Sequence, residues 1–268
     1  TSLDGNEEIQ NKYRKTREGF NGYQKFIQGL NVTRTILGKD ACSPLMTVTK
    51  ENLKQITKSI DHYIECGFNG VFLRALNPYG YAVTNYELLG YDVDEFVDGY
   101  KNALLYIIEQ NKKGYYFIEY YAMLLLQRIL TPFATGFVDL QSPCGNIISG
   151  VIYDYDGNVY ASDEGRMLAR TGDKQFILGN VLKDNYDTIF KGEKAQEIVK
   201  SSCVETLPDC AFCVYQMYCG ADPVRHYTEC GNLYGKRAIS NFCKKNKLII
   251  EFIFELLHRD DDIINDVF

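Results

Sequence analysis

The sequence is poor in several features that define large classes of protein. Its 268 residues include no Trp, only 6 Pro and only 3 His. No apolar run approaches the ~20 residues that a membrane helix requires, and the N-terminal stretch has no signal-peptide pattern. The net charge of −6 is the opposite of the basic footprint that non-specific nucleic-acid binding needs. We therefore expect no membrane partner and no nucleic-acid partner.

The sequence also lacks an initial Met, since it begins with Thr1 in "TSLDG". We expect it to be a piece of a longer protein. The histidines, His62, His226 and His258, are scattered, and none pairs with a candidate nucleophile. The sequence therefore gives no support to a hydrolytic triad, which needs a base beside its nucleophile.

What the chain does contain is apolar side chains and cysteine. It is 46% hydrophobic with 21 Tyr, so we expect a sizeable core, and it carries 9 Cys. A disulfide framework is typical of small secreted domains. In a large acidic chain, these cysteines instead favour reduced thiols in the cytoplasm and metal ligation.

The first half alternates helical and strand patterns. We expect a helix from Glu7 to Leu30, a strand in "CSPLMTVT", a helix in "KENLKQITKSIDHYIEC" and a strand in "NGVFLRAL". The second strand is apolar along its length, which is typical of a buried parallel sheet. The order is therefore β-α-β within an α/β fold.

The pattern changes near residue 132. Before it, Asp92 caps a long helix, with Glu95 in the reciprocal capping position, and "IEYYAMLLLQRIL" predicts a further helix. After it, "GVIYDYDGNVYASDEG" predicts a β-hairpin that turns at Asp156-Gly157. Short helices and an amphipathic helix near residues 240–258 complete the chain. We therefore expect domains at 1–131 and 132–268.

A cluster of cysteines is the strongest chemical signal. Cys210, Cys213 and Cys219 form a C-x2-C-x5-C array in "PDCAFCVYQMYCG", and Cys243 follows in "SNFCKK". Soft thiolates select zinc or iron–sulfur clusters, and both accept four cysteines. Free thiols are the alternative, but such closely spaced thiols are prone to oxidation. The spacing alone does not separate zinc from iron–sulfur.

The wider context resembles a known family. The cysteine array, with the upstream "SPCG" and "YDYDGNVYASDEGRM", is similar to the SPASM extension of radical S-adenosylmethionine (SAM) enzymes. "TSLDG", "CSPLMTVTKEN" and "GVFLRALNPYG" resemble the fourth, fifth and sixth strands of the radical SAM partial barrel. The sequences of these segments are most similar to those of maturases of His-Xaa-Ser peptide systems, and the resemblance covers nearly the whole chain.

The resemblance implies a fold and a cluster. The fold would be α/β, with half of a partial (β/α) barrel in 1–131 and a small α+β SPASM-like iron–sulfur domain in 132–268. The four cysteines of the array would hold one auxiliary 4Fe–4S cluster. The family's other auxiliary cluster lacks two ligands, because Ser162 stands at one of its cysteine positions, and Asp222 and Pro223 stand where a cysteine would follow Cys219. Cys144 is then a buried thiol, or, as an alternative, a ligand together with Asp222.

The C-x3-C-x2-C motif that holds the SAM cluster is absent from this sequence. Cys42 and Cys66 are isolated, and we expect both to be core residues. SAM and a second 4Fe–4S cluster would thus belong to the full-length enzyme, and this chain alone should not cleave SAM.

The resemblance also implies SAM contacts, whereas no catalytic residue is indicated. By position, Ser2 and Arg14 match a Ser and an Arg that help hold SAM, and Leu73 and Arg74 end the strand near the adenine. Arg14 has the alternative of a solvated helix charge. Arg74 closes an apolar strand and needs an anionic partner, which a structural carboxylate would supply equally well.

A smaller group, Asp163, Glu164 and Arg166, follows the hairpin. These side chains would either contact substrate or form a local ion pair, and we favour the ion pair.

The implied function is that of a peptide maturase. Reductive SAM cleavage would yield a radical that abstracts hydrogen from a residue of a ribosomally synthesised peptide. The partners would be that peptide and an electron donor such as a flavodoxin or ferredoxin, in the cytoplasm. The alternative is a non-catalytic metal-binding interaction module, holding zinc or an iron–sulfur cluster.

Overall fold

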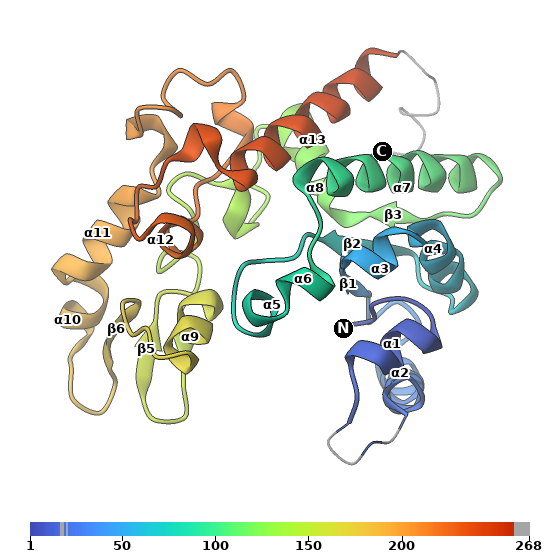
Figure 1. Cartoon of the computed structure of the whole chain (residues 1–268), viewed down its shortest axis with the longest axis horizontal. Helices are drawn as coiled ribbons and strands as arrows, with labels where there is room; N and C mark the ends of the chain where they lie inside the picture. The colour runs from blue at the N-terminus through green and yellow to red at the C-terminus, as the bar shows by residue number, and fades with distance from the viewer. Residues whose placement is uncertain (17–18, 20, 260–268) are drawn as a thin grey trace. The chain divides into compact units, whose positions relative to one another are not determined.

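A computed structural model describes residues 1–16, 19 and 21–259 (Figure 1). The chain divides into two compact units. Unit 1 comprises Thr1–Leu76, Glu87–Met123 and the chain from Glu251, and unit 2 comprises Asn77–Tyr86 and Leu124–Ile250. Both units are discontinuous in sequence. The division into continuous domains near residue 131 stays a prediction.

Unit 1 is a mixed α/β structure. Its elements are α1 (Glu7–Tyr13), α2 (Gly22–Leu37), β1 (Leu45–Thr47), α3 (Lys50–Leu53), α4 (Ile56–Glu65), β2 (Gly70–Arg74), α7 (Val93–Lys112) and β3 (Ile118–Glu119). Three helices have residues in both units: α6 (Tyr86–Leu89), α8 (Tyr120–Leu130) and α13 (Asn241–His258).

The sheet of unit 1 has the order β1-β2-β3, and both pairings are parallel. Leu45 lies opposite Phe72, and Thr47 lies opposite Arg74. Helix α4 packs on β2, α7 packs on β3, and the two helices contact each other. The predicted β-α-β order with a parallel sheet is therefore confirmed.

The helix predicted from Glu7 to Leu30 is wrong as a single element. Helix α1 ends at Tyr13, where Arg14 leaves helical geometry, and α2 begins at Gly22 after the cap Asn21. A Cβ on Gly22 would lie 2.2 Å from the Arg14 carbonyl oxygen, so this return of the chain requires glycine. Residues 17, 18 and 20 of the predicted helix lie outside the described residues.

Two predictions around α7 have different outcomes. The capping prediction is confirmed, because the Glu95 carboxylate accepts the Asp92 N–H at 3.0 Å. The next helix begins later than predicted, because Ile118 and Glu119 pair with β2 as a third strand. The Glu119 carboxylate is buried there and accepts the Leu73 N–H at 3.0 Å. Burial raises the pKa of Glu119.

Unit 2 contains a three-stranded antiparallel sheet of order β4-β5-β6. Its other elements are short helices. In chain order unit 2 has α5 (Tyr81–Thr84), η1 (Val138–Leu140), β4 (Ile152–Tyr153), β5 (Asn158–Tyr160), α9 (Asp163–Arg170), β6 (Ile177–Asn180), α10 (Tyr186–Lys191), α11 (Glu193–Ser201), η2 (Val204–Thr206), η3 (Gln216–Tyr218), α12 (Pro223–Cys230) and η4 (Arg237–Ile239).

The predicted hairpin is confirmed as β4 and β5, with Gly157 at φ 80° in its turn. Strand β6 was not predicted, because "ILGN" is too short to show alternation. Val159, Leu178 and Phe176 belong to one buried apolar cluster with residues of α9, α10, α11 and α12. The final helix predicted near 240–258 is confirmed as α13.

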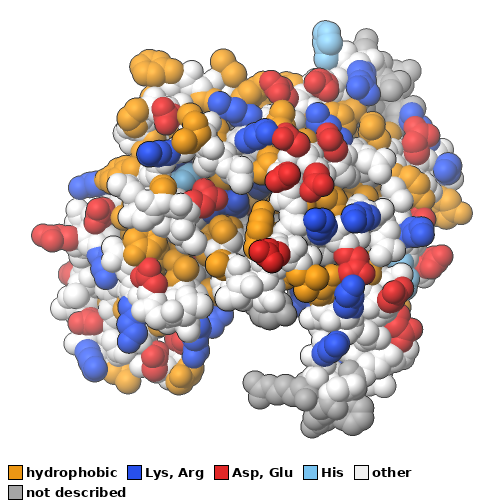
Figure 2. Space-filling view, in the orientation of Figure 1, with side chains coloured by type: hydrophobic (Ala, Val, Ile, Leu, Met, Phe, Trp, Pro, Cys, Tyr) orange, Lys and Arg blue, Asp and Glu red, His pale blue; other side chains and the backbone are white. Residues whose placement is uncertain are grey.

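The surface mixes charges of both signs. On the face drawn in Figure 2, Lys and Arg side chains alternate with Asp and Glu side chains. Within the described residues, no helix has both the length and the apolar composition that a bilayer crossing needs.

Candidate metal centre

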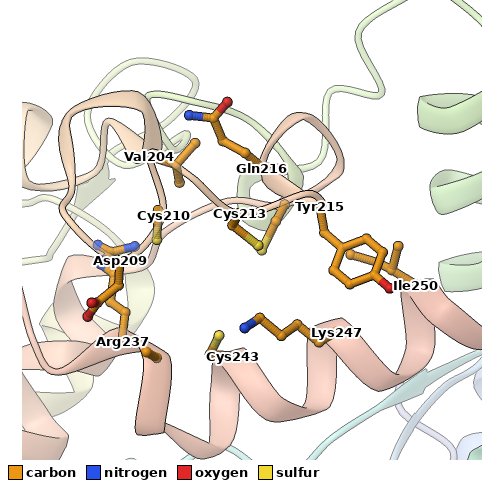
Figure 3. A pocket seen from close by; sticks show the side chains of 12 residues that line it. Val204, Asp209, Cys210, Cys213, Tyr215, Gln216, Arg237, Cys243, Lys247 and Ile250 are labelled. Carbon is orange, nitrogen blue, oxygen red and sulfur yellow. The ribbon is translucent and has the colours of Figure 1, made fainter.

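The four predicted cysteines lie around one cavity of unit 2 (Figure 3). Cys210, Cys213 and Cys219 come from the loop between η2 and α12, and Cys243 comes from the first turn of α13. In Figure 3 the labelled sulfurs point toward the space between this loop and the helix. The cavity measures about 420 Å³, counted with the open space at its mouth.

Tight turns of the loop place the thiols of Cys210 and Cys213 beside the same cavity. The Cys210 N–H donates to the Leu207 carbonyl at 2.9 Å, and the Cys213 N–H donates to the Cys210 carbonyl at 3.0 Å. Cys243 enters from α13, where the Ser240 hydroxyl accepts its N–H at 3.1 Å and caps the helix. Local turns therefore place the loop cysteines, and the packing of α13 adds the fourth.

Two cations border the thiols. Arg237 is 5% exposed and is held by the Tyr234 carbonyl at 3.1 Å and the Ser201 carbonyl at 2.9 Å. Lys247 lines the same cavity from α13. A buried guanidinium needs negative charge nearby, so its position among thiols favours thiolate formation or an anionic group in the cavity.

Burial has the opposite effect on the thiols themselves. It raises the pKa of Cys219 to about 11, and it also raises the pKa of Cys210 and of Cys243. The Arg237 guanidinium lowers the pKa of Cys210 and of Cys243 but does not cancel the effect of burial. Without a ligand, these thiols stay protonated near neutral pH. A metal would have to displace those protons.

The four thiols line a cavity without converging on one point. Among the described residues, no three His, Cys, Asp or Glu side chains converge closely enough to hold one metal ion. One zinc ion would gather four sulfurs at ~2.3 Å from a common centre. A 4Fe–4S cluster takes one thiolate at each of several irons. Zinc and an iron–sulfur cluster stay the two alternatives for these thiols.

The positions that depart from the family's cysteine pattern are helix N-caps. The Ser162 hydroxyl accepts the Gly165 N–H at 3.2 Å and caps α9. The Asp222 carboxylate accepts the Val224 N–H at 3.0 Å and caps α12. Its second oxygen accepts the Tyr79 hydroxyl at 3.1 Å. These side chains therefore already have partners within the protein.

Cys144 is buried, with 3% of its surface exposed, as predicted for a structural thiol. Burial raises the pKa of Cys144 to about 12, and the Asp222 carboxylate adds to this rise. Burial also raises the pKa of Asp222 to about 6. A shared cluster at Cys144 and Asp222 stays an untested alternative.

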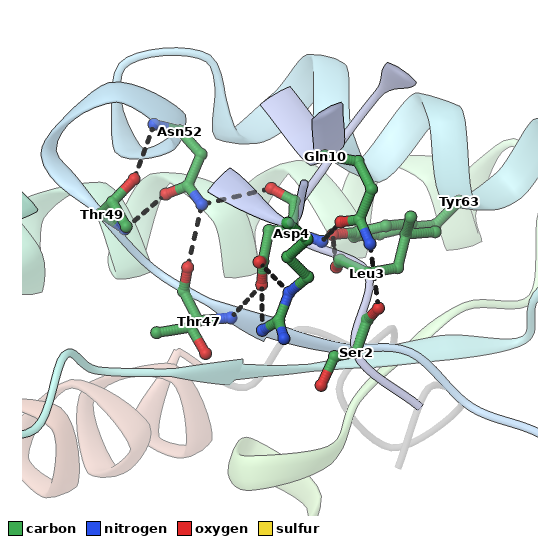
Figure 4. Close-up of polar contacts among 9 residues, drawn as sticks. Ser2, Leu3, Asp4, Gln10, Thr47, Thr49, Asn52 and Tyr63 are labelled. Atoms are coloured by element: carbon green, nitrogen blue, oxygen red, sulfur yellow. Dashed lines mark hydrogen bonds and ion pairs between the residues drawn. The ribbon is translucent and has the colours of Figure 1, made fainter. Parts of the chain in front are cut away.

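Asp4, Thr47 and Asn52 belong to a polar network of unit 1 (Figure 4), and Arg14 pairs with Asp4 in it. The Arg14 guanidinium pairs with the buried Asp4 carboxylate, with Nη2 and Oδ1 3.3 Å apart. Asp4 Oδ1 also accepts the Thr47 N–H at 3.0 Å, and Asn52 Nδ2 donates to the Asp4 carbonyl at 3.2 Å. Arg14 is therefore more than a solvated helix charge, because it neutralises a buried carboxylate.

The other predicted SAM contacts lie on neighbouring segments of the same unit. Ser2 bridges to Leu45, beside the first register pair of β1 and β2, and Arg74 lies opposite Thr47. The side chain of Leu73 is buried. The structure thus brings Ser2, Leu73 and Arg74 onto adjacent parallel segments, next to the Asp4–Arg14 pair. Their contact with SAM stays a prediction.

Asp163 and Arg166 form the local ion pair that we favoured, with Oδ1 and Nη2 2.7 Å apart on α9. Two other expectations are wrong. Cys42 and Cys66 are both partly exposed and are not core residues. His62 does have a thiol beside it, because its Nε2 lies 3.6 Å from Cys66 Sγ.

Sequence reasoning missed the polar side chains that support each region. Asn246 Nδ2 donates to Cys219 Sγ at 3.5 Å, and Arg237 lies beside the cysteines. Neither residue has a motif of its own. The four-residue spacing of His62 and Cys66 was readable as one helical face, and Asp4 stands out as an acid directly after the buried Leu3.

The fold as a whole is similar to that of a radical SAM maturase. No family model and no curated protein matches the chain. Solved structures of anSMEcpe, a radical SAM/SPASM sulfatase-maturating enzyme, do match it. The structure with bound AdoMet has 19% identity and a TM-score of 0.74, over 99% of this chain and 67% of that one.

Two further structures of the same protein also contain peptides. With AdoMet and the Cp18Cys peptide, the identity is 18% and the TM-score 0.75, over 99% of this chain and 68% of that one. With the Kp18Cys peptide, the values are 19% and 0.71, over 99% and 68%. The chain thus spans about two thirds of the length of these proteins. The likeness does not single out the His-Xaa-Ser type.

Proposed function

We propose that the chain is the C-terminal portion of a radical SAM/SPASM enzyme that modifies a ribosomally synthesised peptide. Unit 2 would hold one auxiliary 4Fe–4S cluster through Cys210, Cys213, Cys219 and Cys243. The observation that carries the proposal is the shared cavity of these four thiols. The fold likeness to a peptide-bound maturase supports it. As part of the same proposal, the enzyme would be a maturase of the His-Xaa-Ser type.

The surrounding residues would tune the bound cluster. A 4Fe–4S cluster supplies one-electron chemistry, and its potential depends on net charge, on hydrogen bonds to sulfur and on solvent exposure. Arg237 and Lys247 would offset negative charge on the thiolates. Asn246 would stabilise the Cys219 thiolate through its amide N–H groups.

Unit 1 would contribute to SAM binding in the full-length enzyme. Ser2, Leu73 and Arg74 lie on adjacent segments of its sheet, and Arg14 follows α1 and pairs with Asp4. The carboxyl ends of parallel strands are the usual place for ligands in α/β folds. Because Arg14 is already paired with Asp4, its role would be to stabilise the conformation of the chain beside Ser2 and the end of β2. A cytoplasmic peptide and a flavodoxin or ferredoxin as electron donor complete the proposal.

The test is anaerobic reconstitution with iron and sulfide, followed by analysis of both elements and a visible spectrum. We expect about four iron and four sulfide per chain, with a broad visible absorption that dithionite bleaches. Cys210→Ala should abolish this binding. Cys230→Ser should keep it, because Cys230 is exposed and does not line the cavity. About eight iron per chain would contradict the single cluster.

The second candidate is a non-catalytic metal-binding module. The absence of C-x3-C-x2-C from this sequence favours it. One zinc per chain without sulfide would support this candidate and would overturn the iron–sulfur proposal.

A further inference from the structure

A second group of metal-ligating side chains lies in unit 1, apart from the four-cysteine cavity. His62 and Cys66 are four residues apart at the C-terminal end of α4, and Tyr23 reaches them from α2. The Tyr23 hydroxyl lies 3.0 Å from His62 Nε2 and 4.0 Å from Cys66 Sγ. The third side of the triangle, from His62 Nε2 to Cys66 Sγ, is 3.6 Å. Sulfur, nitrogen and oxygen atoms thus lie within 4.0 Å of one another.

The distance between sulfur and nitrogen matches that of two ligands of a tetrahedral ion. With Zn–S ~2.3 Å and Zn–N ~2.0–2.1 Å at a tetrahedral angle, the sulfur and nitrogen of two ligands are about 3.6 Å apart. The observed separation between Cys66 and His62 is 3.6 Å. Ligands spaced four residues apart on a helix share one face. A metal ion would therefore need little rearrangement of α4.

The surrounding contacts hold the donors in place. Arg34 Nη1 donates to the Cys66 carbonyl at 2.7 Å, and Arg34 Nη2 donates to the Gly67 carbonyl at 3.1 Å. These bonds from α2 fix the end of α4 that carries the thiol. The same guanidinium lowers the pKa of Cys66, which favours the thiolate, although burial raises that pKa more.

Both ring nitrogens of His62 have polar groups nearby. Its Nε2 faces Cys66 and Tyr23, while its Nδ1 lies 3.9 Å from a Glu65 carboxylate oxygen. Histidine ligands commonly donate the second ring N–H to a carboxylate, which fixes the tautomer. Burial lowers the pKa of His62, which favours the neutral imidazole. Its side chain is 19% exposed, so an ion can reach it.

We propose that Cys66, His62 and Tyr23 form a zinc-class metal site in unit 1, with the fourth position open to water. Thiolate and imidazole are the donors that borderline-soft divalent ions prefer. Binding would release the Cys66 thiol proton to solvent, and Glu65 would orient the imidazole. The Tyr23 hydroxyl would be the weakest of the three ligands, because burial raises its pKa to about 12.

The experiment counts Zn²⁺ on the reduced, metal-free chain by equilibrium dialysis. The four-cysteine cavity is unchanged in every variant, so its zinc is a constant background. We expect the native chain to bind about one Zn²⁺ more than Cys66→Ser or His62→Asn does. Glu65→Gln should weaken this site by about tenfold, as loss of a carboxylate partner does elsewhere. Tyr23→Phe should weaken the site but leave the zinc count unchanged.

Cys42→Ser is the matched control, since it removes a partly exposed thiol elsewhere in the chain. It should leave the zinc count unchanged. An equal count in the native chain and in Cys66→Ser would overturn the proposal. If circular dichroism shows that Cys66→Ser is unfolded, His62→Asn decides by the same criterion. The outcome is independent of whether the four-cysteine cavity holds iron–sulfur.

Discussion

The polar network of unit 1 and the thiol cavity of unit 2 differ in how their buried polar groups are paired. In unit 1, the Asp4 carboxylate is buried, and the protein itself supplies the Arg14 guanidinium and the Thr47 N–H. In unit 2, the thiols of Cys210, Cys219 and their neighbours border open space, and burial keeps them protonated. The protein itself satisfies the buried carboxylate of unit 1, whereas the thiols of unit 2 line a cavity that a ligand could fill.

This difference indicates which unit a bound ligand would stabilise. A satisfied network stabilises the native state without help, because each donor has its acceptor. A ligand cavity is stabilised by whatever occupies it, in proportion to the occupancy. Adding or removing the metal should therefore change the stability of unit 2, and breaking an ion pair should change the stability of unit 1.

The largest expected effect is that of metal on unit 2. A bound cluster at 100-fold above its dissociation constant would stabilise its site by about 2.7 kcal/mol. We expect amide hydrogen exchange of residues 207–221 to slow by about 100-fold after reconstitution. Exchange in α7 of unit 1 should not change. Equal slowing in both places would mean that the metal acts on the whole chain.

Breaking the network of unit 1 should have the next largest effect. Asp4→Ala leaves Arg14 unpaired and removes the acceptor of the Thr47 N–H, at a cost of about 2–3 kcal/mol in the free energy of unfolding. Urea titration measures this cost. Lys12→Ala is the control, because its ion pair with Glu51 is half exposed and should contribute less than about 1 kcal/mol. Similar costs for both variants would contradict the difference between buried and exposed pairs.

The buried carboxyl of unit 2 should give a pH dependence. Burial raises the pKa of Asp222 from 3.8 to about 6, so the folded state binds this proton more tightly than the unfolded state. The linked stability is present below about pH 4 and is lost as pH rises to about 6. Asp222→Asn should flatten this part of the curve of unfolding free energy against pH. An unchanged slope in the variant would show that another group titrates there.

The smallest effect should come from the amide beside Cys219. Asn246→Leu removes the N–H groups that stabilise negative charge on that sulfur. Because the reduced cluster carries more negative charge, we expect a lower reduction potential and unchanged iron content. Anaerobic redox titration measures the potential. Lower iron content in this variant would assign Asn246 to cluster assembly instead.

The parts of the fold that were predicted correctly depend on local spacing. The Asp92–Glu95 cap and the hairpin turn at Gly157 are set within a few residues. The helix predicted from Glu7 to Leu30 failed for the opposite reason. Its interruption depends on Gly22 passing close to the Arg14 carbonyl, which no periodicity reveals.

The sequence by itself determined the candidate ligands, because the spacing of Cys210, Cys213 and Cys219 confines them to one loop. Only the tertiary structure decided what surrounds them. It paired Arg14 with Asp4, placed Arg237 and Asn246 beside the thiols, and set Tyr23 against the Cys66–His62 pair. Local spacing decides which candidate ligands lie close together in the chain. Long-range packing decides which of them are already satisfied.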